Sequence, residues 1–199
     1  QSFIWELRLP RLFDSLLVGS SLGMSGALLQ GMLRNGLASP YLLGISAGSG
    51  LVIVFFISFS LVQTFIPFAA WIGAILTTLI VFVLSKEGNK IVVERLVLGG
   101  VAISSLFGAI QATLLLNAED GRIQAALNWL IGSLNARGWQ EIKFTALPIL
   151  IALFIGLFLY RQLNLLSLGD ELSVSLGTSL FRSRCLIGAI ATLLAACAV

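Results

Sequence analysis

The residues most suggestive of chemistry are serines flanked by glycines. Residues 44–48 (GISAG) have the G-x-S-x-G spacing of a hydrolase nucleophile elbow, and residues 23–26 (GMSG) could belong to an intramembrane serine protease. Either serine would need a base to remove its proton, and the usual base is histidine. Because the sequence contains no histidine, we interpret both stretches as small residues that pack helices together.

Other catalytic and metal-binding patterns are also missing from the sequence. It has no G-x-x-x-x-G-K-[ST] phosphate loop, so the chain is not expected to hydrolyse nucleotide itself. Cys185 and Cys197 stand in one apolar segment, and we interpret them as apolar fillers rather than as a disulfide or metal pair. We therefore predict no catalytic residue, no metal site and no cofactor bound by this chain.

The composition predicts a membrane protein. Hydrophobic residues make up 58% and charged residues 11%, against about 25% charged residues in a soluble domain. The mean hydropathy is +1.02. The net charge of +3 is spread among the connections, which gives no support for nucleic-acid binding. We predict an all-α integral membrane protein, a polytopic helix bundle in a lipid bilayer.

Six hydrophobic segments are expected to form this bundle. They cover residues 12–33, 42–62, 68–85, 96–117, 144–160 and 185–199. The last segment has only 15 residues, whereas about 20 are needed to span a bilayer. The sequence is therefore expected to be a fragment or the product of a truncated gene.

The connections fall into two alternating sets. The first set holds seven basic residues: Arg34, Lys86, Lys90, Arg95, Arg161, Arg182 and Arg184. The second set holds five: Arg8, Arg11, Arg122, Arg137 and Lys143. All four tryptophans fall at or near the second set, as in a membrane interface. The excess of basic residues predicts that the first set is cytoplasmic.

Small residues recur every four positions in three segments, which would place them on one helix face. They are Gly19, Gly23, Ala27 and Gly31; Gly100, Ser104, Gly108 and Ala112; and Gly188, Thr192 and Ala196. We predict close helix packing along these stripes. The connection 118–143 is too long for a turn, and residues 123–131 within it are predicted to form an interfacial helix or a re-entrant segment.

The connection 161–184 predicts two short amphipathic helices joined by Gly169. Asp170 and Glu171 open the second helix, where acids are favourable, and Gly177 ends it. Leu172 and Leu176 lie four residues apart, on one side of that helix. An apolar edge of this kind fits a groove on another protein, and the alternative is a solvated connector.

Three motifs give the chain a family resemblance. They are residues 8–11 (RLPR) leading into 18–19 and 25–30 (SGALLQ); residues 34–40 (RNGLASP) followed by 42–48; and residues 168–171 (LGDE) ending at 176–177. The chain resembles the FecCD- and BtuC-like permease family of type II ATP-binding-cassette importers for iron-siderophores, haem and cobalamin. It is similar to the second through seventh membrane helices of that family. The resemblance implies a partial type II importer fold, with residues 1–199 as one permease domain and 163–179 as its coupling helices.

The resemblance also implies roles for individual residues. Arg8 and Arg11 would dock a substrate-binding protein, and Asn35, Leu37, Val92 and Val93 would form a cytoplasmic gate. The residues implied in coupling to the ATPase are Leu168, Gly169, Asp170, Glu171, Leu172, Leu176 and Gly177. The chain departs from the family at Gly36, where proline is usual, and at Asp14, a charge in an apolar first turn that would lie near the outer interface or face the pathway.

The implied function is that of a permease subunit in a bacterial plasma (inner) membrane. Its partners would be ATP-binding-cassette ATPases, which use the ATP, a substrate-binding protein, and a second permease subunit of the same or a different kind. The expected substrate is an iron(III)-siderophore chelate. Haem or cobalamin import, or a truncated bundle that does not transport, are the alternatives.

Overall fold

The structure is a computed structural model that describes residues 4–61, 65–88, 90–133 and 139–198. A π-helical turn, η1 (Ile4–Arg8), leads into α1 (Leu9–Leu33). The remaining helices are the 3₁₀ turn η2 (Pro40–Leu43), α2 (Ile45–Ser58), α3 (Ile66–Ser85), α4 (Val93–Leu116), α5 (Asp120–Ile131), α6 (Trp139–Phe158), α7 (Tyr160–Ser167), α8 (Asp170–Ser175) and α9 (Leu180–Cys197). Strands β1 (Lys86–Glu87) and β2 (Lys90–Ile91) form a small antiparallel hairpin. The predicted all-α bundle is confirmed.

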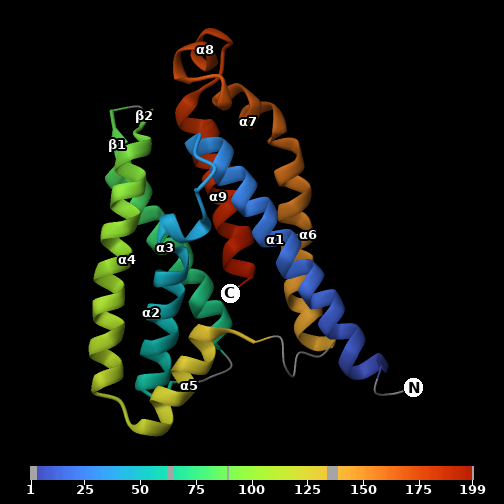
Figure 1. The fold of residues 1–199 in the computed structure, drawn as a ribbon, viewed down its shortest axis with the longest axis vertical. Coiled ribbons are helices and arrows are strands. Elements are labelled where there is room, and N and C mark those ends of the chain that lie inside the picture. The colour runs from blue at the N-terminus through green and yellow to red at the C-terminus, as the bar shows by residue number, and fades with distance from the viewer. Residues whose placement is uncertain (1–3, 62–64, 89, 134–138, 199) are drawn as a thin grey trace.

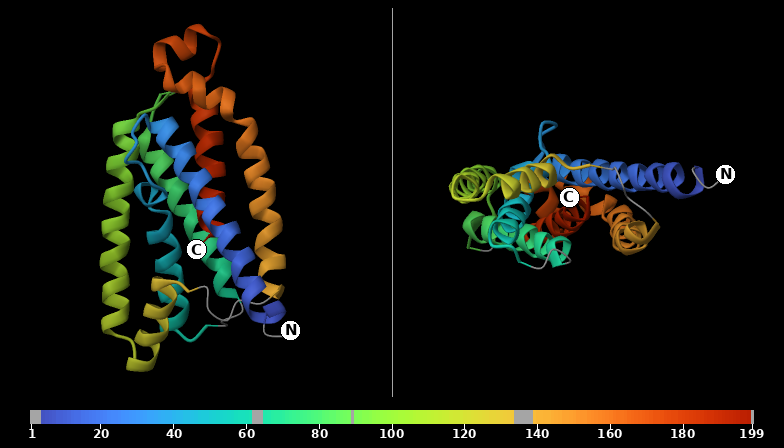
Figure 2. Two further views of the ribbon diagram at one scale, coloured as in Figure 1. Left: turned by 45° about the vertical axis from the view of Figure 1, so that its right-hand side comes forward. Right: turned by 90° about the horizontal axis from the view of Figure 1, so that it is seen from below.

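Helix α9 lies at the centre of the bundle. It contacts α1, α6 and α3, and 61% of its most apolar window is buried, the largest share among the candidate membrane spans of the described chain. In Figure 1, α2, α3 and α4 lie to the left of α9, and α1 and α6 lie to its right. The view from below in Figure 2 shows the same two groups on either side of α9.

The connections gather at two opposite ends, as the alternation in the sequence predicts. We call them the α8 end, where α7, α8, the hairpin and the last turn of α1 lie, and the α5 end, where α5 and the N-terminus lie (Figure 1). At the α5 end the indole of Trp139 donates a 3.0 Å hydrogen bond to the carbonyl oxygen of Trp5. The two rings are 5.7 Å apart.

Each of the six predicted hydrophobic segments contains a helix, but the helices differ in length. Within the described residues, four helices are long and apolar enough to cross a membrane: residues 4–33, α3, α4 and α9. A fifth span results if α6 and α7, which are bent by 51°, count as one. Helix α9 qualifies because it begins at Leu180 rather than at Cys185.

The predicted segment 42–62 contains a much shorter helix. Gly44, with a φ of +71°, separates η2 from α2. Helix α2 then has 14 residues, a rise of about 21 Å, which is less than the roughly 30 Å of a bilayer core. The glycine-serine motif thus follows a 3₁₀ turn, whereas a nucleophile elbow requires a preceding strand.

Helix α1 is joined to α9 by serine hydroxyls. Ser21 donates a 2.6 Å hydrogen bond to the carbonyl oxygen of Leu194, and Ser25 donates one of 2.7 Å to that of Ala191. Both serines are fully buried. Interhelical hydrogen bonds from small side chains of this kind hold helices together where the surroundings are apolar.

The small-residue stripes are partly confirmed. On α9 Gly188 packs against the ring of Phe82, and Thr192 lies 3.4 Å from Thr78, hydroxyl to hydroxyl. On α1 only Gly31 packs as predicted, because a methyl group there would lie 2.7 Å from the side chain of Leu163. Gly19, Gly23 and Ala27 are exposed, and the face packed against α9 carries Ser21 and Ser25 instead.

A closely packed glycine contact was not among the predicted stripes. A methyl group built on Gly48 of α2 would lie 2.6 Å from the carbonyl oxygen of Gly73 on α3. A methyl group built on Gly73 would likewise lie 2.6 Å from the carbonyl oxygen of Gly48. Only hydrogen fits at both positions. This contact confirms that the glycines of residues 44–48 serve packing.

Helix α4 offers a test of close packing with a control on the same helix. A methyl group on Gly100 would overlap the backbone carbonyl oxygen of Leu42, whereas one on Gly108 would meet nothing within 4 Å. We expect Gly100→Ala to destabilise the protein by about 1–3 kcal/mol through overpacking. Gly108→Ala should be neutral or stabilising by up to about 1 kcal/mol, because alanine favours helix.

Thermal unfolding of the two variants in one detergent measures this difference. A Gly100→Ala variant with the melting temperature of its Gly108→Ala counterpart would contradict the close approach of α4 to the segment around Leu42.

Candidate functional site

The predicted coupling residues lie in a protruding segment made of α7 and α8 (Figure 1). Gly169, with a φ of +110°, separates the two helices. After α8 the N–H of Thr178 donates to the carbonyl oxygen of Ser173 and that of Gly177 to Val174, with Gly177 at a φ of +81°. This is the Schellman pattern of a glycine-terminated helix. The predicted pair of helices, joined by Gly169 and ended by Gly177, is confirmed.

The α7–α8 segment exposes apolar side chains. Leu168, Leu172, Val174 and Leu176 are each 55–60% exposed, while Leu166 is buried and anchors the segment to the bundle. Contiguous exposed apolar side chains at a protruding end are typical of an interaction surface. Leu172 and Leu176 are thus exposed, and docking through their edge stays a prediction.

Ser173 fixes α8 to the end of α7. Its hydroxyl oxygen is buried, 2.6 Å from the carbonyl oxygen of Leu165 and 2.5 Å from that of Gly169. The single hydroxyl proton is therefore shared between an acceptor in α7, Leu165, and one at Gly169, the residue before α8. This bond favours movement of α7 and α8 as one unit.

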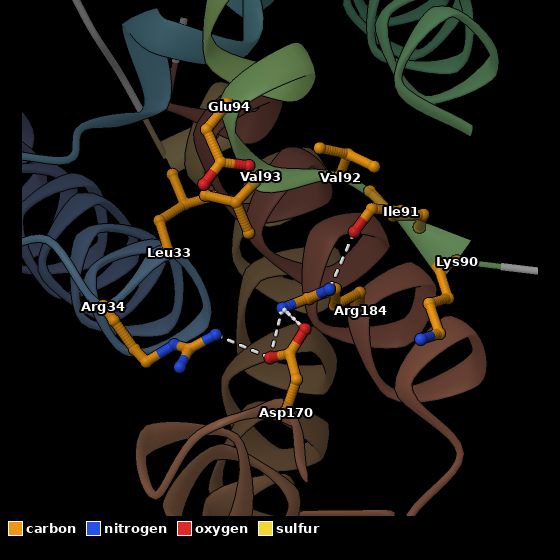
Figure 3. Close-up of a pocket in the computed structure, with 9 residues that line it drawn as sticks. All are labelled: Leu33, Arg34, Lys90, Ile91, Val92, Val93, Glu94, Asp170 and Arg184. Atoms are coloured by element: carbon orange, nitrogen blue, oxygen red, sulfur yellow. Dashed lines mark hydrogen bonds and ion pairs between the residues drawn. The ribbon is translucent and has the colours of Figure 1, made fainter. Parts of the chain in front are cut away.

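Asp170, the first residue of α8, lies between two arginines (Figure 3). Its Oδ1 atom accepts a 2.5 Å hydrogen bond from Nη2 of Arg34 and one of 2.8 Å from Nη2 of Arg184. Arg184 Nη2 also lies 3.0 Å from Oδ2. Arg184 Nη1 donates to the carbonyl oxygen of Ile91 at 2.7 Å. We call Arg34, Asp170 and Arg184 the ion cluster.

The members of the ion cluster differ sharply in exposure. The side chain of Arg184 is 3% exposed, whereas those of Arg34 and Asp170 are 39% and 38% exposed. A buried guanidinium left without its carboxylate is strongly destabilising, because the desolvated charge is then uncompensated. The Arg34–Asp170 contact is nearer to water and weaker for that reason.

The four predicted gate residues lie at the α8 end, but in two settings. Val92 and Val93 line a pocket of about 430 Å³, together with Leu33, Arg34, Lys90, Ile91, Glu94, Asp170 and Arg184 (Figure 3). Asn35 and Leu37 occupy the turn that follows α1, where Asn35 Oδ1 accepts a 2.9 Å bond from the N–H of Leu37. Leu37 is 89% exposed.

Arg8 and Arg11 lie at the opposite end of the bundle. Both are exposed near the start of α1, beside the buried Pro10. Asp14 is buried near the start of α1, at 8% exposure. The structure thus places the predicted docking arginines and the predicted coupling residues at the two ends of the α1–α9 pair (Figure 1).

Arg184 is the site residue whose role the sequence interpretation missed. The apolar segment was drawn from Cys185 onward, so Arg184 counted as a loop charge. Because α9 begins at Leu180, Arg184 lies in its second turn and points into the bundle. An arginine next to an apolar run is a signal for a functional or paired charge.

The ion cluster joins four elements of the fold. Its polar atoms are two guanidinium groups, a carboxylate and backbone carbonyl oxygens, joined across α1, the hairpin, α8 and α9. Such a junction couples the positions of the elements that it joins.

Comparison with known proteins identifies the family. All 199 residues match the profile of the FecCD transport family. The chain is 37% identical to the iron(3+)-hydroxamate import system permease protein FhuG of Bacillus subtilis, 36% to the ferric enterobactin transport system permease protein FepG of Escherichia coli, and 34% to the cobalamin import system permease protein BtuC of Halobacterium salinarum. These alignments cover 98%, 98% and 100% of this chain, and 60%, 59% and 54% of those proteins.

A solved structure also has the same fold as this chain. It is an inward-facing conformation assigned to the metal-chelate type of ABC transporter, with a TM-score of 0.93 and 30% identity over 100% of this chain and 64% of the other. The chain therefore spans a little more than half the length of the relatives that it matches. Since the family profile covers the chain from end to end, this protein belongs to the FecCD transport family.

Proposed function

We propose that this chain is the central part of a permease subunit in an ATP-binding-cassette importer that carries an iron(III)-siderophore chelate across a bacterial plasma membrane. The observation that carries the proposal is the match to the FecCD transport family over residues 1–199. Residues 1–199 act as one permease domain in this proposal, and 163–179 act as its coupling helices. The chain itself binds no cofactor and performs no covalent chemistry.

The α7–α8 segment is the proposed contact with the ATPase. Its exposed Leu172 and Leu176 support this assignment, because apolar side chains on a protruding helix fit a groove of a second protein. Leu168, Gly169, Asp170, Glu171 and Gly177 shape the same segment. ATP is bound and hydrolysed by that partner, and closure of two ATPases displaces the segment.

The exposed Arg8 and Arg11 are the proposed contact with a substrate-binding protein. They lie at the end opposite to α8, so a chelate delivered there would travel along the bundle toward Asn35, Leu37, Val92 and Val93. A second permease subunit, identical or different, supplies the other wall of the pathway. The 89% exposure of Leu37 supports its assignment to a contact with that subunit.

The choice of an iron chelate rests on the relatives. FhuG and FepG are named for iron(3+)-hydroxamate and ferric enterobactin, and BtuC for cobalamin. Haem or cobalamin import is the alternative within the same fold. A chain that no longer transports is the alternative outside it.

The proposed substrate class is tested by reconstitution. The full-length protein containing this chain, with its ATPase and binding protein in proteoliposomes, should take up ⁵⁵Fe-labelled hydroxamate or catecholate chelates only when ATP is present. Haemin and cobalamin are assayed in parallel, and preferential uptake of either assigns the alternative substrate. Absence of ATP-dependent uptake for every compound would contradict an importer.

The docking arginines are tested by charge reversal. Arg8→Glu with Arg11→Glu should weaken the binding protein about tenfold or more, because like charges would then face each other across the contact. Surface plasmon resonance on the reconstituted transporter measures the dissociation constant. Arg182→Glu, which reverses an exposed charge at the α8 end, is the matched control and should leave binding-protein affinity unchanged. Equal affinity in all three proteins would exclude the two arginines from docking.

The coupling leucines are tested by copurification. Leu172→Asp with Leu176→Asp should reduce the amount of bound ATPase by about tenfold or more, since charges would enter an apolar contact. Leu116→Asp alters a leucine that is 86% exposed at the α5 end, and it should leave ATPase binding intact. A normal yield of copurified ATPase in the double variant would exclude Leu172 and Leu176 from the contact with the ATPase.

A further inference from the structure

The ion cluster joins three parts of the chain that are far apart in sequence. Arg34 ends α1, Asp170 opens α8 and Arg184 lies in α9. We propose that Asp170 is a positioning residue that ties the α7–α8 segment to both predicted gate segments, and that the Arg34–Asp170 contact is the one that opens and closes. This inference rests on the proposed function and names how movement would pass through the site.

The first gate segment is reached through Arg34. This residue adopts the left-handed conformation, with a φ of +51°, and so turns the chain sharply at the end of α1. The next residue, Asn35, donates its N–H to the carbonyl oxygen of Gln30 at 3.1 Å and accepts from Leu37 with its side chain. The guanidinium bonded to Asp170 therefore belongs to the residue directly before the Asn35–Leu37 turn.

The second gate segment is reached through Arg184. Its Nη1 atom donates to the carbonyl oxygen of Ile91, the residue directly before Val92 and Val93 (Figure 3). The N–H of Val92 donates to the carbonyl oxygen of Ser85 at 3.0 Å, so this strand end is held from both sides. Asp170 is thus connected to the first predicted gate segment through the side chain of Arg34 and to the second through that of Arg184.

Exposure decides which of the two contacts can change. Separating Asp170 from Arg184 would leave a guanidinium unpaired at 3% exposure, which is costly. Separating it from Arg34 releases a side chain that is 39% exposed, and water can replace the carboxylate. The Arg184 contact therefore persists, and the Arg34 contact is free to alternate.

The α7–α8 segment is built to carry a displacement to Asp170. The Ser173 hydroxyl in α8 lies within hydrogen-bond distance of the carbonyl oxygens of Leu165 in α7 and of Gly169, so the two short helices are held together. Leu172 and Leu176 lie in or directly after the same short helix as Asp170. A partner that moves these leucines moves the carboxylate with them, and the distance to Arg34 changes.

The experiment follows the gate turn directly. The full-length transporter, with its ATPase in nanodiscs, carries Leu37→Cys in a background without other cysteines. The labelling rate with a water-soluble maleimide is compared in the nucleotide-free state and after trapping with ATP and vanadate. With the ion cluster unmodified, the labelling rates in the nucleotide-free and trapped states should differ clearly. Arg34→Gln and Asp170→Asn should each reduce that ratio by about tenfold, a typical size for coupling between sites.

The pattern among variants separates coupling from stability. The Arg34→Gln, Asp170→Asn double variant should be no worse than Asp170→Asn alone, because Asp170→Asn already removes the Arg34 contact together with the carboxylate that faces Arg184. Asp170→Glu should restore part of the ratio. Arg34→Gln should retain the ATPase and an unchanged melting temperature, because Arg34 lies outside the α7–α8 segment. Arg95→Gln, which breaks the exposed 3.3 Å pair with Glu87 at the same end, should leave the ratio unchanged.

Two results overturn the inference alone. The first is a normal ratio of labelling rates in both Arg34→Gln and Asp170→Asn. The second is a ratio in the double variant that is reduced by the sum of the two single effects. Either result counts when the unmodified transporter still imports its chelate. If the unmodified transporter shows neither uptake nor an ATP-dependent ratio, the proposed function fails and the inference fails with it.

Discussion

The structure at the α8 end depends on one buried charge, the guanidinium of Arg184. At 3% exposure it can be accommodated only where acceptors surround it, and Asp170 and the carbonyl oxygen of Ile91 supply them. These acceptors come from α8 and from the hairpin, so satisfying one charge fixes the positions of two connections against α9. The Nε atom of Arg184 is buried without a hydrogen-bond partner in the described part of the chain, so the Nη1 and Nη2 contacts carry the satisfaction of this guanidinium.

The rest of the bundle is held by contacts that need small residues rather than charges. The backbones of α2 and α3 meet at Gly48 and Gly73, and Ser21 and Ser25 bind carbonyl oxygens of α9. Apolar lipid offers no hydrophobic gain for helix association, so close packing and hydrogen bonds must supply it. Small residues tie the middle of the bundle together, and the charges of the ion cluster are confined to its α8 end.

Much of the fold could be predicted from the sequence because its strongest signals are local. Apolar runs gave the helices, and Gly169 and Gly177 gave the breaks around α8. Faces were harder to predict: a four-residue repeat on α1 marked Gly19 and Gly23, whereas the buried face is set by which side meets α9. The pairing of Arg34 with Asp170 spans 136 positions, and no local pattern reveals such a contact.

The turn at Asn35 holds Gly36, where the sequence resemblance leads us to expect proline. Gly36 has a negative φ, a methyl group on it would meet nothing within 4 Å, and the turn closes through the N–H of Ala38 and the carbonyl oxygen of Asn35. Proline favours this second position of a turn and would stiffen it, so glycine here is not demanded by the backbone. The turn is constrained instead by two hydrogen bonds near its start. The N–H of Leu37 donates to the side chain of Asn35, and the guanidinium of Arg34 donates to Asp170. A flexible Gly36 therefore makes this turn depend more, not less, on the ion cluster beside it.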